Sequence, residues 1–236
     1  MEINILQLIE GAKQARGLAV IIDVFRAFST ACYVTERGAA AIVPVGDIEI
    51  AYRLKRENPS YILMGERGGV VQPGFDLGNS PTHAERTDFA GRTVVHTTSA
   101  GTQGIANAGL ADEVITGSFV NAGAIAEYIR RRNPERVSLV CMGLGGTKQA
   151  DEDTLCAEYL KNALEGKPND FERIVRYLRE ESRTGSFMDL QGEASEASAP
   201  KTDFERCLAL DRFGFVLKVE PFGDDLKQLK KIAVYE

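Results

Sequence analysis

Short runs of Val, Ile, Leu and Ala alternate with longer segments in which apolar residues recur at helical spacing, as far as Cys141. The runs are too short for helices, and their near-continuous apolarity is typical of strands that are covered on both faces. The pattern predicts strands at Leu18–Asp23, Ala41–Val45, Tyr61–Met64, Thr93–Thr97, Glu113–Thr116 and Arg136–Cys141.

The segments between these runs predict helices. Asp47 is a good N-cap for one of them, and Gly38 and Gly109 stand where a helix should stop. The helices are expected at Ala27–Arg37, Ile48–Asn58, Gly101–Ala108, Ala122–Arg132 and Glu152–Leu164, the last with Asp151 as its cap. Alternation of this kind predicts right-handed βαβ units, and so an α/β protein with three α/β/α layers and a mostly parallel central sheet.

The C-terminal third has a different pattern. Gly, Ser, Ala and Glu dominate residues 185–200, which we interpret as a variable exposed loop. Around it we predict an amphipathic helix at Phe171–Arg183, a helix at Phe204–Leu210, a strand at Phe215–Val219 and an edge strand at Ile232–Val234. No internal repeat or shift in composition divides the chain, so residues 1–236 are expected to form a single domain.

Composition narrows the class of protein. A chain of 236 residues with 44% hydrophobic and 26% charged residues can fold without disulfides or a structural metal. Its net charge of -6 disfavours binding to nucleic acid or to an acidic membrane surface, yet it allows an anionic substrate at a local positive site. The four cysteines form no C-x-x-C pair and are expected to be buried thiols. With neither a signal peptide nor a membrane span predicted, we expect a cytoplasmic protein. The sequence is compatible with a homo-oligomer.

Polar and charged residues follow several predicted strands, at the edge where ligands bind in open α/β sheets. Asp23 ends the first strand, where a carboxylate could bind Mg²⁺ or simply cap the next helix. Arg26 could hold a phosphate or sulfonate through two hydrogen bonds, or could be a solvated helix residue. Each residue alone could have a structural role. Because several such groups converge on one rim, a binding site is favoured.

A turn rich in hydroxyl groups follows the fourth strand and begins a helix. Backbone amides and the positive end of a helix dipole attract anions there, although Ser and Thr are also common caps. The hydroxyls and the glycine exceed what a cap needs, so anion binding is favoured for Thr97, Thr98, Ser99, Gly101 and Thr102.

Further acids and amides stand near the same rim. Glu152 and Asp153 begin a helix after a glycine-rich loop, where they could bind metal or only complement the helix dipole. Glu66 lies in another glycine-rich loop, and Asn79 and Ser80 could donate to a substrate or shape the turn before Pro81. An oxygen-rich set of this kind favours Mg²⁺ or Mn²⁺ over Zn²⁺.

Several familiar sites are absent from the sequence. There is no D-x-D of an aspartyl-phosphate phosphatase, no cysteine followed by the arginine of a cysteine phosphatase loop, and no Walker or dinucleotide motif. His83 and His96 are too few for a histidine-rich two-metal site, and both are interpreted as structural.

The segments Val20–Ala27, Gly65–Gly69, Gly74–Pro81, Thr97–Thr102 and Glu152–Ala157 resemble the 2-phosphosulfolactate phosphatase family. The string Gly-Phe-Asp-Leu-Gly-Asn-Ser-Pro at residues 74–81 is the most specific of them, and the likeness extends over roughly the first 165 positions. The resemblance implies an α/β/α fold and Mg²⁺-dependent hydrolysis of 2-phosphosulfolactate, a small anionic phosphoester, to 3-sulfolactate and phosphate. That reaction is a step of coenzyme M synthesis.

A working assignment of roles follows. Asp23 and Arg26 are the catalytic candidates, with Arg26, Thr98, Ser99 and the Gly101 amide around the phosphate and Arg67 and Asn79 nearer the organic end. Mg²⁺ is expected to be held by Asp23, Glu152 and Asp153, with Glu66 as a further candidate ligand. Two rival hypotheses are a lyase or isomerase that acts on a small anionic hydroxy acid, and a non-catalytic module that binds an anionic metabolite.

Overall fold

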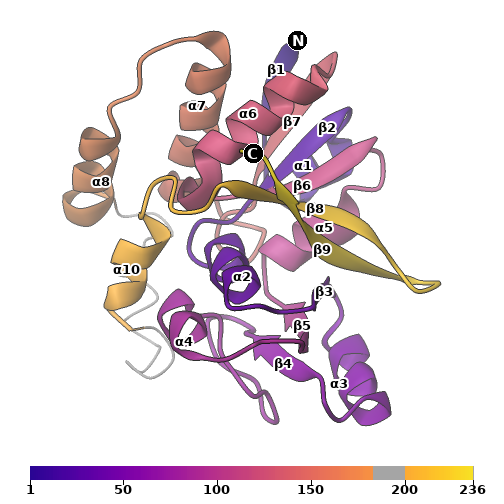
Figure 1. Ribbon diagram of the computed structural model, residues 1–236. Helices are drawn as coiled ribbons and strands as arrows, with labels where there is room; N and C mark the ends of the chain where they lie inside the picture. Colours follow the sequence, from indigo (N-terminus) through magenta and orange to yellow (C-terminus); the bar gives the residue numbers. More distant parts are fainter. Residues whose placement is uncertain (183–199, 236) are drawn as a thin grey trace.

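A computed structural model describes residues 1–182 and 200–235. In this part of the chain, nine strands form one sheet in the order β1-β7-β2-β6-β8-β9-β3-β5-β4 (Figure 1). The strands are β1 (Glu2–Gln7), β2 (Leu18–Ile22), β3 (Ala41–Pro44), β4 (Ile62–Gly65), β5 (Thr93–Thr97), β6 (Glu113–Gly117), β7 (Arg136–Cys141), β8 (Phe215–Phe222) and β9 (Leu226–Ala233).

Helices flank the sheet and give the predicted α/β/α arrangement. They are α1 (Leu8–Gln14), α2 (Ala27–Glu36), α3 (Ile48–Glu57), α4 (Pro81–Arg86), α5 (Gly101–Asn107), the 3-10 turn η1 (Phe119–Asn121), α6 (Ala122–Arg132), α7 (Asp151–Glu165), α8 (Phe171–Glu180) and α10 (Thr202–Cys207). None of these helices in residues 1–182 and 200–235 combines the length and the apolarity that a bilayer span requires.

An antiparallel hairpin divides the sheet into two parallel groups of strands. On one side β1, β7, β2 and β6 pair in parallel, and on the other side so do β3, β5 and β4. The hairpin of β8 and β9 lies between them, visible as the long yellow ribbon in Figure 1. It joins each group through a single antiparallel residue pair, Ile115 with Lys218 and Ile42 with Leu229.

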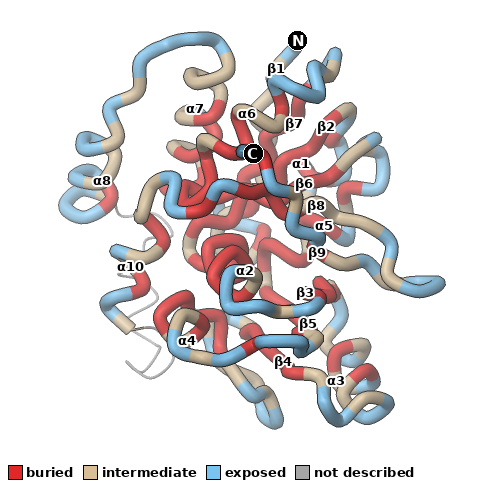
Figure 2. The backbone as a smooth tube through the Cα atoms, viewed as in Figure 1, coloured by how far each residue is buried: buried red, intermediate tan, exposed pale blue. Residues whose placement is uncertain are grey.

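The core follows the strands, which form the buried centre of the tube in Figure 2. β2 is buried along its whole length, as its uninterrupted Leu-Ala-Val-Ile-Ile sequence predicts for a strand covered on both faces. One apolar cluster contains residues from both groups of strands, including Ile21, Ile42, Val94 and Leu229. The two halves therefore share a core.

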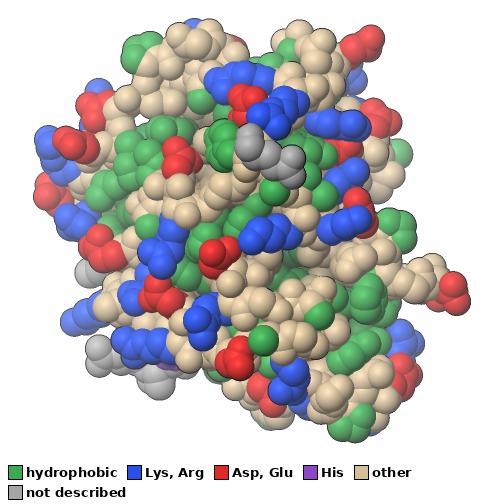
Figure 3. All heavy atoms as spheres, viewed as in Figure 1, with side chains coloured by type: hydrophobic (Ala, Val, Ile, Leu, Met, Phe, Trp, Pro, Cys, Tyr) green, Lys and Arg blue, Asp and Glu red, His purple; other side chains and the backbone are tan. Residues whose placement is uncertain are grey.

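The surface is mixed in charge. Figure 3 shows basic and acidic side chains interspersed over one face, with hydrophobic side chains between them. Exposed ion pairs such as Arg131 with Glu127 contribute roughly 0–1 kcal/mol each, so burial of the apolar core dominates stability. The four cysteines are free and buried, as predicted.

The central strands and helices confirm the predictions from the sequence. Other predictions are corrected, mainly toward the ends of the chain. The prediction of an edge strand at Ile232–Val234 is wrong, because β9 lies inside the sheet, between β8 and β3. Asp151 is not the cap of α7: Ala150 holds that position, and the Asp151 carboxylate accepts from Tyr177 and Ser182. The elements β1, α1 and α4 were not predicted. Nearly all of the predicted loop at residues 185–200 lies outside the described residues.

Candidate active site

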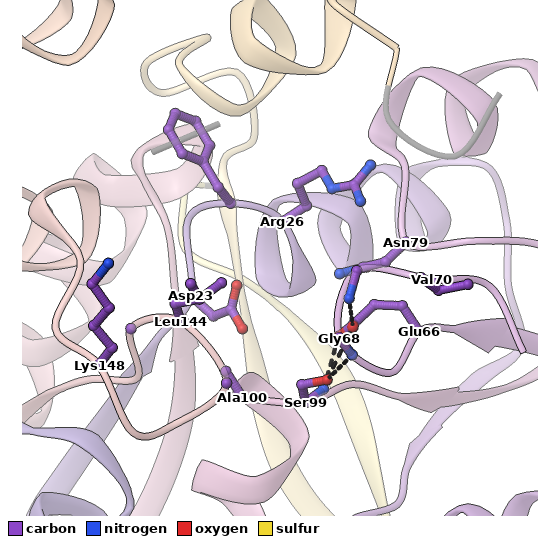
Figure 4. A pocket seen from close by; sticks show the side chains of 14 residues that line it. Asp23, Arg26, Glu66, Gly68, Val70, Asn79, Ser99, Ala100, Leu144 and Lys148 are labelled. Carbon is purple, nitrogen blue, oxygen red and sulfur yellow. Dashed lines mark hydrogen bonds between the residues drawn. The ribbon is translucent and has the colours of Figure 1, made fainter. Parts of the chain in front are cut away.

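Residues that follow strands of both parallel groups line one cavity of about 580 Å³ (Figure 4). Its wall is supplied by the segments after β2, β4, β5 and β7, together with the residue that precedes the N-cap of α4. The lining residues are Asp23, Phe25, Arg26, Glu66, Gly68, Gly69, Val70, Asn79, Ser99, Ala100, Gly143, Leu144, Gly145 and Lys148. Five of the residues predicted from the sequence are among them: Asp23, Arg26, Glu66, Asn79 and Ser99.

Asp23 stands at the carboxyl end of β2, with 6% of its surface exposed. Its carboxylate accepts a hydrogen bond from the Ala27 amide at 3.0 Å and another from the Gly101 amide. A Cβ atom at position 101 would lie 2.8 Å from Asp23 Oδ2, so glycine is needed for this close approach. Burial outweighs these hydrogen bonds and raises the pKa of Asp23 to about 6, with the Glu66 charge acting in the same direction.

Asp153 and Glu152 lie behind the cavity wall, at the start of α7. Asp153 accepts from the Val24 and Gly143 amides, each at 2.8 Å, and so ties the loops after β2 and β7 together. Burial, followed by the charge of Asp23, raises the pKa of Asp153 to about 8. Burial and the charge of Asp153 also raise the pKa of Glu152, whose buried Oε2 atom has no hydrogen-bond partner among the described residues.

Glu66 fastens two loops at the cavity mouth. Its carboxylate accepts from the Ser99 amide at 2.8 Å, the Ser99 hydroxyl at 3.0 Å and the Gly69 amide at 2.7 Å. The Ser99 hydroxyl in turn accepts from the Gly68 amide at 2.8 Å, and these bonds are the dashed lines in Figure 4. Glu66 therefore holds the loops after β4 and β5 at a fixed distance from each other.

The threonines of the hydroxyl-rich turn lie in the wall rather than on its surface. The Thr98 amide donates to Thr102 Oγ1 at 2.9 Å, and the Thr102 amide donates to Thr98 Oγ1 at 3.2 Å, so the two threonines bond each other across the start of α5. Thr97 Oγ1 accepts from Arg67 Nη2 at 2.6 Å. Of the turn predicted to bind an anion, the structure brings Ser99 and Ala100 into the cavity.

Arg67 is not among the residues that line the cavity, although it was expected near the substrate. Its guanidinium group donates to the Gly46 carbonyl oxygen at 2.9 Å and to the Glu66 carbonyl oxygen at 2.8 Å, besides its bond to Thr97. These contacts fasten the loop after β4 to the end of β3. The structure therefore supports a positioning role for Arg67 rather than contact with a substrate.

Arg26 forms a buried ion pair with a residue that the sequence did not single out. Its Nη1 atom lies 2.9 Å from Oδ2 of Asp203 on α10, and both side chains are almost completely buried. Asp203 Oδ1 accepts from the Ser80 hydroxyl at 2.8 Å and from the Thr82 amide at 3.0 Å. Ser80 is thus used at the start of α4 and is not among the residues that line the cavity. No local signal marked Asp203, because it is 177 residues from Arg26 along the chain.

His96 lies behind Asn79 and orients it. His96 Nε2 is 3.2 Å from Asn79 Oδ1, and burial lowers the pKa of His96 to about 3, so the ring is neutral. Because Oδ1 can only accept, the proton is on Nε2, and the buried Nδ1 has no hydrogen-bond partner in residues 1–182 and 200–235. The amide nitrogen of Asn79 is then the end available to the cavity that this residue lines (Figure 4). His96 is structural, as predicted, but it acts on a residue of the site.

The acids fit a cation in their charge and chemistry. Burial raises the pKa values of three carboxylates, at Asp23, Glu152 and Asp153, and the charge of Asp23 raises the pKa values of the other two further. A divalent ion would supply the missing countercharge. Oxygen donors are those that Mg²⁺ prefers, commonly one or two carboxylates with water and substrate oxygens. No group of three His, Cys, Asp or Glu side chains in the described residues is arranged to hold one ion. Asp23, which lines the cavity, suits a metal site whose other ligands come from the substrate. Binding of one ion by all four acids, Asp23, Glu66, Glu152 and Asp153, stays a prediction.

A cavity at the strand ends of an α/β sheet, with buried acids and a buried arginine around it, defines an enzyme site for a small anion. The family model described as 2-phosphosulpholactate phosphatase matches residues 3–221. The chain belongs to this family, and so to a class of phosphoric monoester hydrolases.

Relatives described as probable 2-phosphosulfolactate phosphatases support the assignment. The protein from Caldicellulosiruptor saccharolyticus is 42% identical over 158 residues, which cover 65% of this chain and 65% of that protein. The protein from Thermoplasma volcanium is 31% identical over 87% of this chain and 92% of its own length. The protein from Pseudothermotoga lettingae is 36% identical over 83% of each.

Proposed function

We propose that this protein is a Mg²⁺-dependent phosphatase that hydrolyses 2-phosphosulfolactate to 3-sulfolactate and phosphate. The observation that carries the proposal is the buried Asp23 carboxylate, which stands in the cavity of a 2-phosphosulpholactate phosphatase family member with its pKa raised by burial. Perturbed carboxylates in a cavity are typical of catalytic sites.

In this proposal Asp23 would hold the metal, with Glu152 and Asp153 supplying negative charge behind it. When bound, Mg²⁺ would neutralise charge on the phosphoryl oxygens and lower the pKa of a bound water. Asp153 keeps Asp23 in place indirectly, because its bond to the Val24 amide fixes the backbone next to Asp23.

Arg26 would bind the phosphoryl oxygens, held in place by its ion pair with Asp203. A fixed guanidinium group stabilises charge that develops on a phosphoryl group without having to reorganise. Asn79 would donate its amide hydrogens beside it. Attack by water forms the new P–O bond, the bond from phosphorus to the C2 oxygen breaks, and a proton passes to that oxygen to give the hydroxyl of 3-sulfolactate.

The test is phosphate release from 2-phosphosulfolactate by the purified protein, with Mg²⁺ and with EDTA. We expect release that needs the metal, loss of release in Asp23→Asn, and unchanged release in Asp224→Asn, an exposed acid on the turn between β8 and β9. Release that persists in EDTA would remove the metal from the proposal. Conversion of the substrate without phosphate release would favour a lyase or isomerase, and binding without conversion would favour a binding module.

A further inference from the structure

The two basic side chains that line the cavity in the described part of the chain differ in their partners. Arg26 is buried and is paired with Asp203. Lys148 is exposed, and its ammonium group has neither an ion pair nor a hydrogen bond to any residue in 1–182 and 200–235. Of the two cationic side chains that line the cavity, Lys148 is therefore the one whose charge is not balanced by an ion pair with a described residue.

The backbone beneath Lys148 is fixed. The Leu144 amide donates to the Lys148 carbonyl oxygen at 2.8 Å, and the Lys148 amide donates to the Leu144 carbonyl oxygen at 3.2 Å. Gly143 has a φ of 62°, and a Cβ atom there would lie 2.2 Å from the Lys148 carbonyl oxygen, so only glycine permits this turn. The Gly143 amide is itself held by Asp153. The side chain of Lys148 thus extends from an anchored turn that is tied to the acids behind the wall.

Lys148 and Arg26 lie on opposite sides of Asp23. In Figure 4 the Asp23 carboxylate projects into the space between them, with Lys148 on the left and Arg26 on the upper right. A cavity with a cation at each side and an acid between them suits a ligand with two separated anionic ends. A lysine is also a compact charge on a flexible stem, which can meet an anionic group without the bidentate geometry that arginine imposes.

We infer that Lys148 determines specificity by binding the sulfonate of 2-phosphosulfolactate, an inference that rests on the proposed function. The carboxylate carbon, C1, is bonded directly to the carbon that bears the phosphoester, whereas the sulfonate is bonded to C3 and so lies one bond further from that carbon. With the phosphoryl group beside Asp23 and Arg26, the sulfonate is the anionic group that extends toward the opposite side. Lys148 supplies the positive charge there.

The experiment compares two substrates in two variants. 2-Phospholactate has a methyl group where 2-phosphosulfolactate has the CH₂-sulfonate, so it keeps the phosphoester and the carboxylate. In Lys148→Met we expect KM for 2-phosphosulfolactate to rise about tenfold to a hundredfold, the range of one charge-assisted hydrogen bond, with kcat nearly unchanged. The kcat/KM for 2-phospholactate should stay at the wild-type value. Lys230→Met removes an exposed lysine on β9 that pairs with Glu220 and should change neither substrate's constants.

Each outcome has a definite meaning. A large loss for 2-phosphosulfolactate alone supports the inference, and a partial recovery in Lys148→Arg would support it further. An equal loss for both substrates would overturn it, because Lys148 would then act on the phosphoryl group or the carboxylate. Unchanged constants for both would also overturn it. Wild-type protein that turns over neither substrate would instead sink the proposed function, before the variants are compared.

Discussion

The Asp23 carboxylate occupies a position that is unfavourable for stability. It is buried at the end of an apolar strand, close to the charges of Glu66, Glu152 and Asp153. Two backbone amides favour its charged form, but burial dominates and raises its pKa. Groups held at such a cost to the fold are concentrated at functional sites, where the charge is needed for ligand binding or chemistry.

We therefore expect Asp23→Asn to stabilise the protein while it removes turnover. A raised pKa means that the ionised form is penalised in the folded state, so above pH 6 the neutral amide should gain roughly 3 kcal/mol. The gain should shrink as the pH falls from 6 to 4, where the wild-type carboxyl also becomes neutral. Urea unfolding in EDTA at pH 7.5 and pH 4 measures it. A variant that is less stable than the wild type at pH 7.5 would contradict this account.

His96 should lower the stability of the fold at acid pH, whereas the buried Asp23 lowers it at higher pH. Its pKa is lowered to about 3 in the folded protein, so an unfolded chain binds a proton below about pH 6.5 that the folded chain cannot accept. Stability is thus lost as the pH falls from 6.5 toward 3. In His96→Gln this loss should be smaller by about 1.4 kcal/mol per pH unit between pH 6 and 4, measured by urea unfolding. Parallel pH profiles of the two proteins would show that His96 titrates normally.

At the scale of elements, α10 reaches the site through Asp203. This side chain joins α10 to Arg26 at the start of α2 and to Ser80 and Thr82 at the start of α4. Removing one partner of a buried ion pair leaves the other charge uncompensated, which commonly costs about 3–5 kcal/mol. Asp203 is therefore interpreted as a positioning residue that acts on chemistry through Arg26.

A double-mutant cycle tests that role. We expect Asp203→Asn to lower kcat/KM for 2-phosphosulfolactate about tenfold to a hundredfold, and to lower it no further in an Arg26→Gln background. Thr202→Val is the matched control, because it removes the 2.9 Å contact of α10 with Thr82 without touching the ion pair. Its kcat/KM should equal that of the wild type. Equal losses from Asp203→Asn in both backgrounds would mean that Asp203 supports only the fold.

Elements could be predicted where a pattern within their own residues indicated them. β2 is continuously apolar and was predicted, whereas β1 alternates polar and apolar residues in Glu-Ile-Asn-Ile-Leu-Gln, because it is an edge strand paired only with β7. Of β9, only the apolar run Ile232–Val234 near its end was predicted, as an edge strand. Its eight-residue pairing with β8 places it inside the sheet, and pairing partners are set by contacts distant in sequence.

The site residues also divide into those that a local sequence pattern indicated and those that it did not. Asp23, Glu66 and Asn79 follow strands or glycine-rich turns, and the sequence therefore marked them as residues of the ligand-binding edge. Asp203 gave no such signal. Lys148 does follow a glycine-rich turn, but it was not predicted as a site residue. Thr98 and Thr102 of the hydroxyl-rich turn bond each other, a pairing that the sequence did not reveal.

On the scale of the whole molecule, the site lies where two parallel groups of strands meet. Asp23 and Lys148 come from the group containing β2 and β7, whereas Glu66 and Ser99 come from the group containing β4 and β5. The hairpin of β8 and β9 lies between the two groups and is paired in the sheet with one strand of each. Together with the apolar cluster that the groups share, it sets the distance between them. The geometry of the site therefore depends on residues of the hairpin that lie outside the cavity.

Leu229 is the hairpin residue on which this dependence should be clearest. It is 4% exposed, pairs with Ile42 and belongs to the shared cluster, so Leu229→Ala should lower the free energy of unfolding by about 2–4 kcal/mol. Because the core is common to both halves, urea should unfold them in one transition, and hydrogen exchange of β5 and β7 should accelerate together. Leu226→Ala, at the partly exposed start of β9, should cost less. Faster exchange in β5 with β7 unchanged would show that the halves are stabilised separately, and that the hairpin does not set the geometry between them.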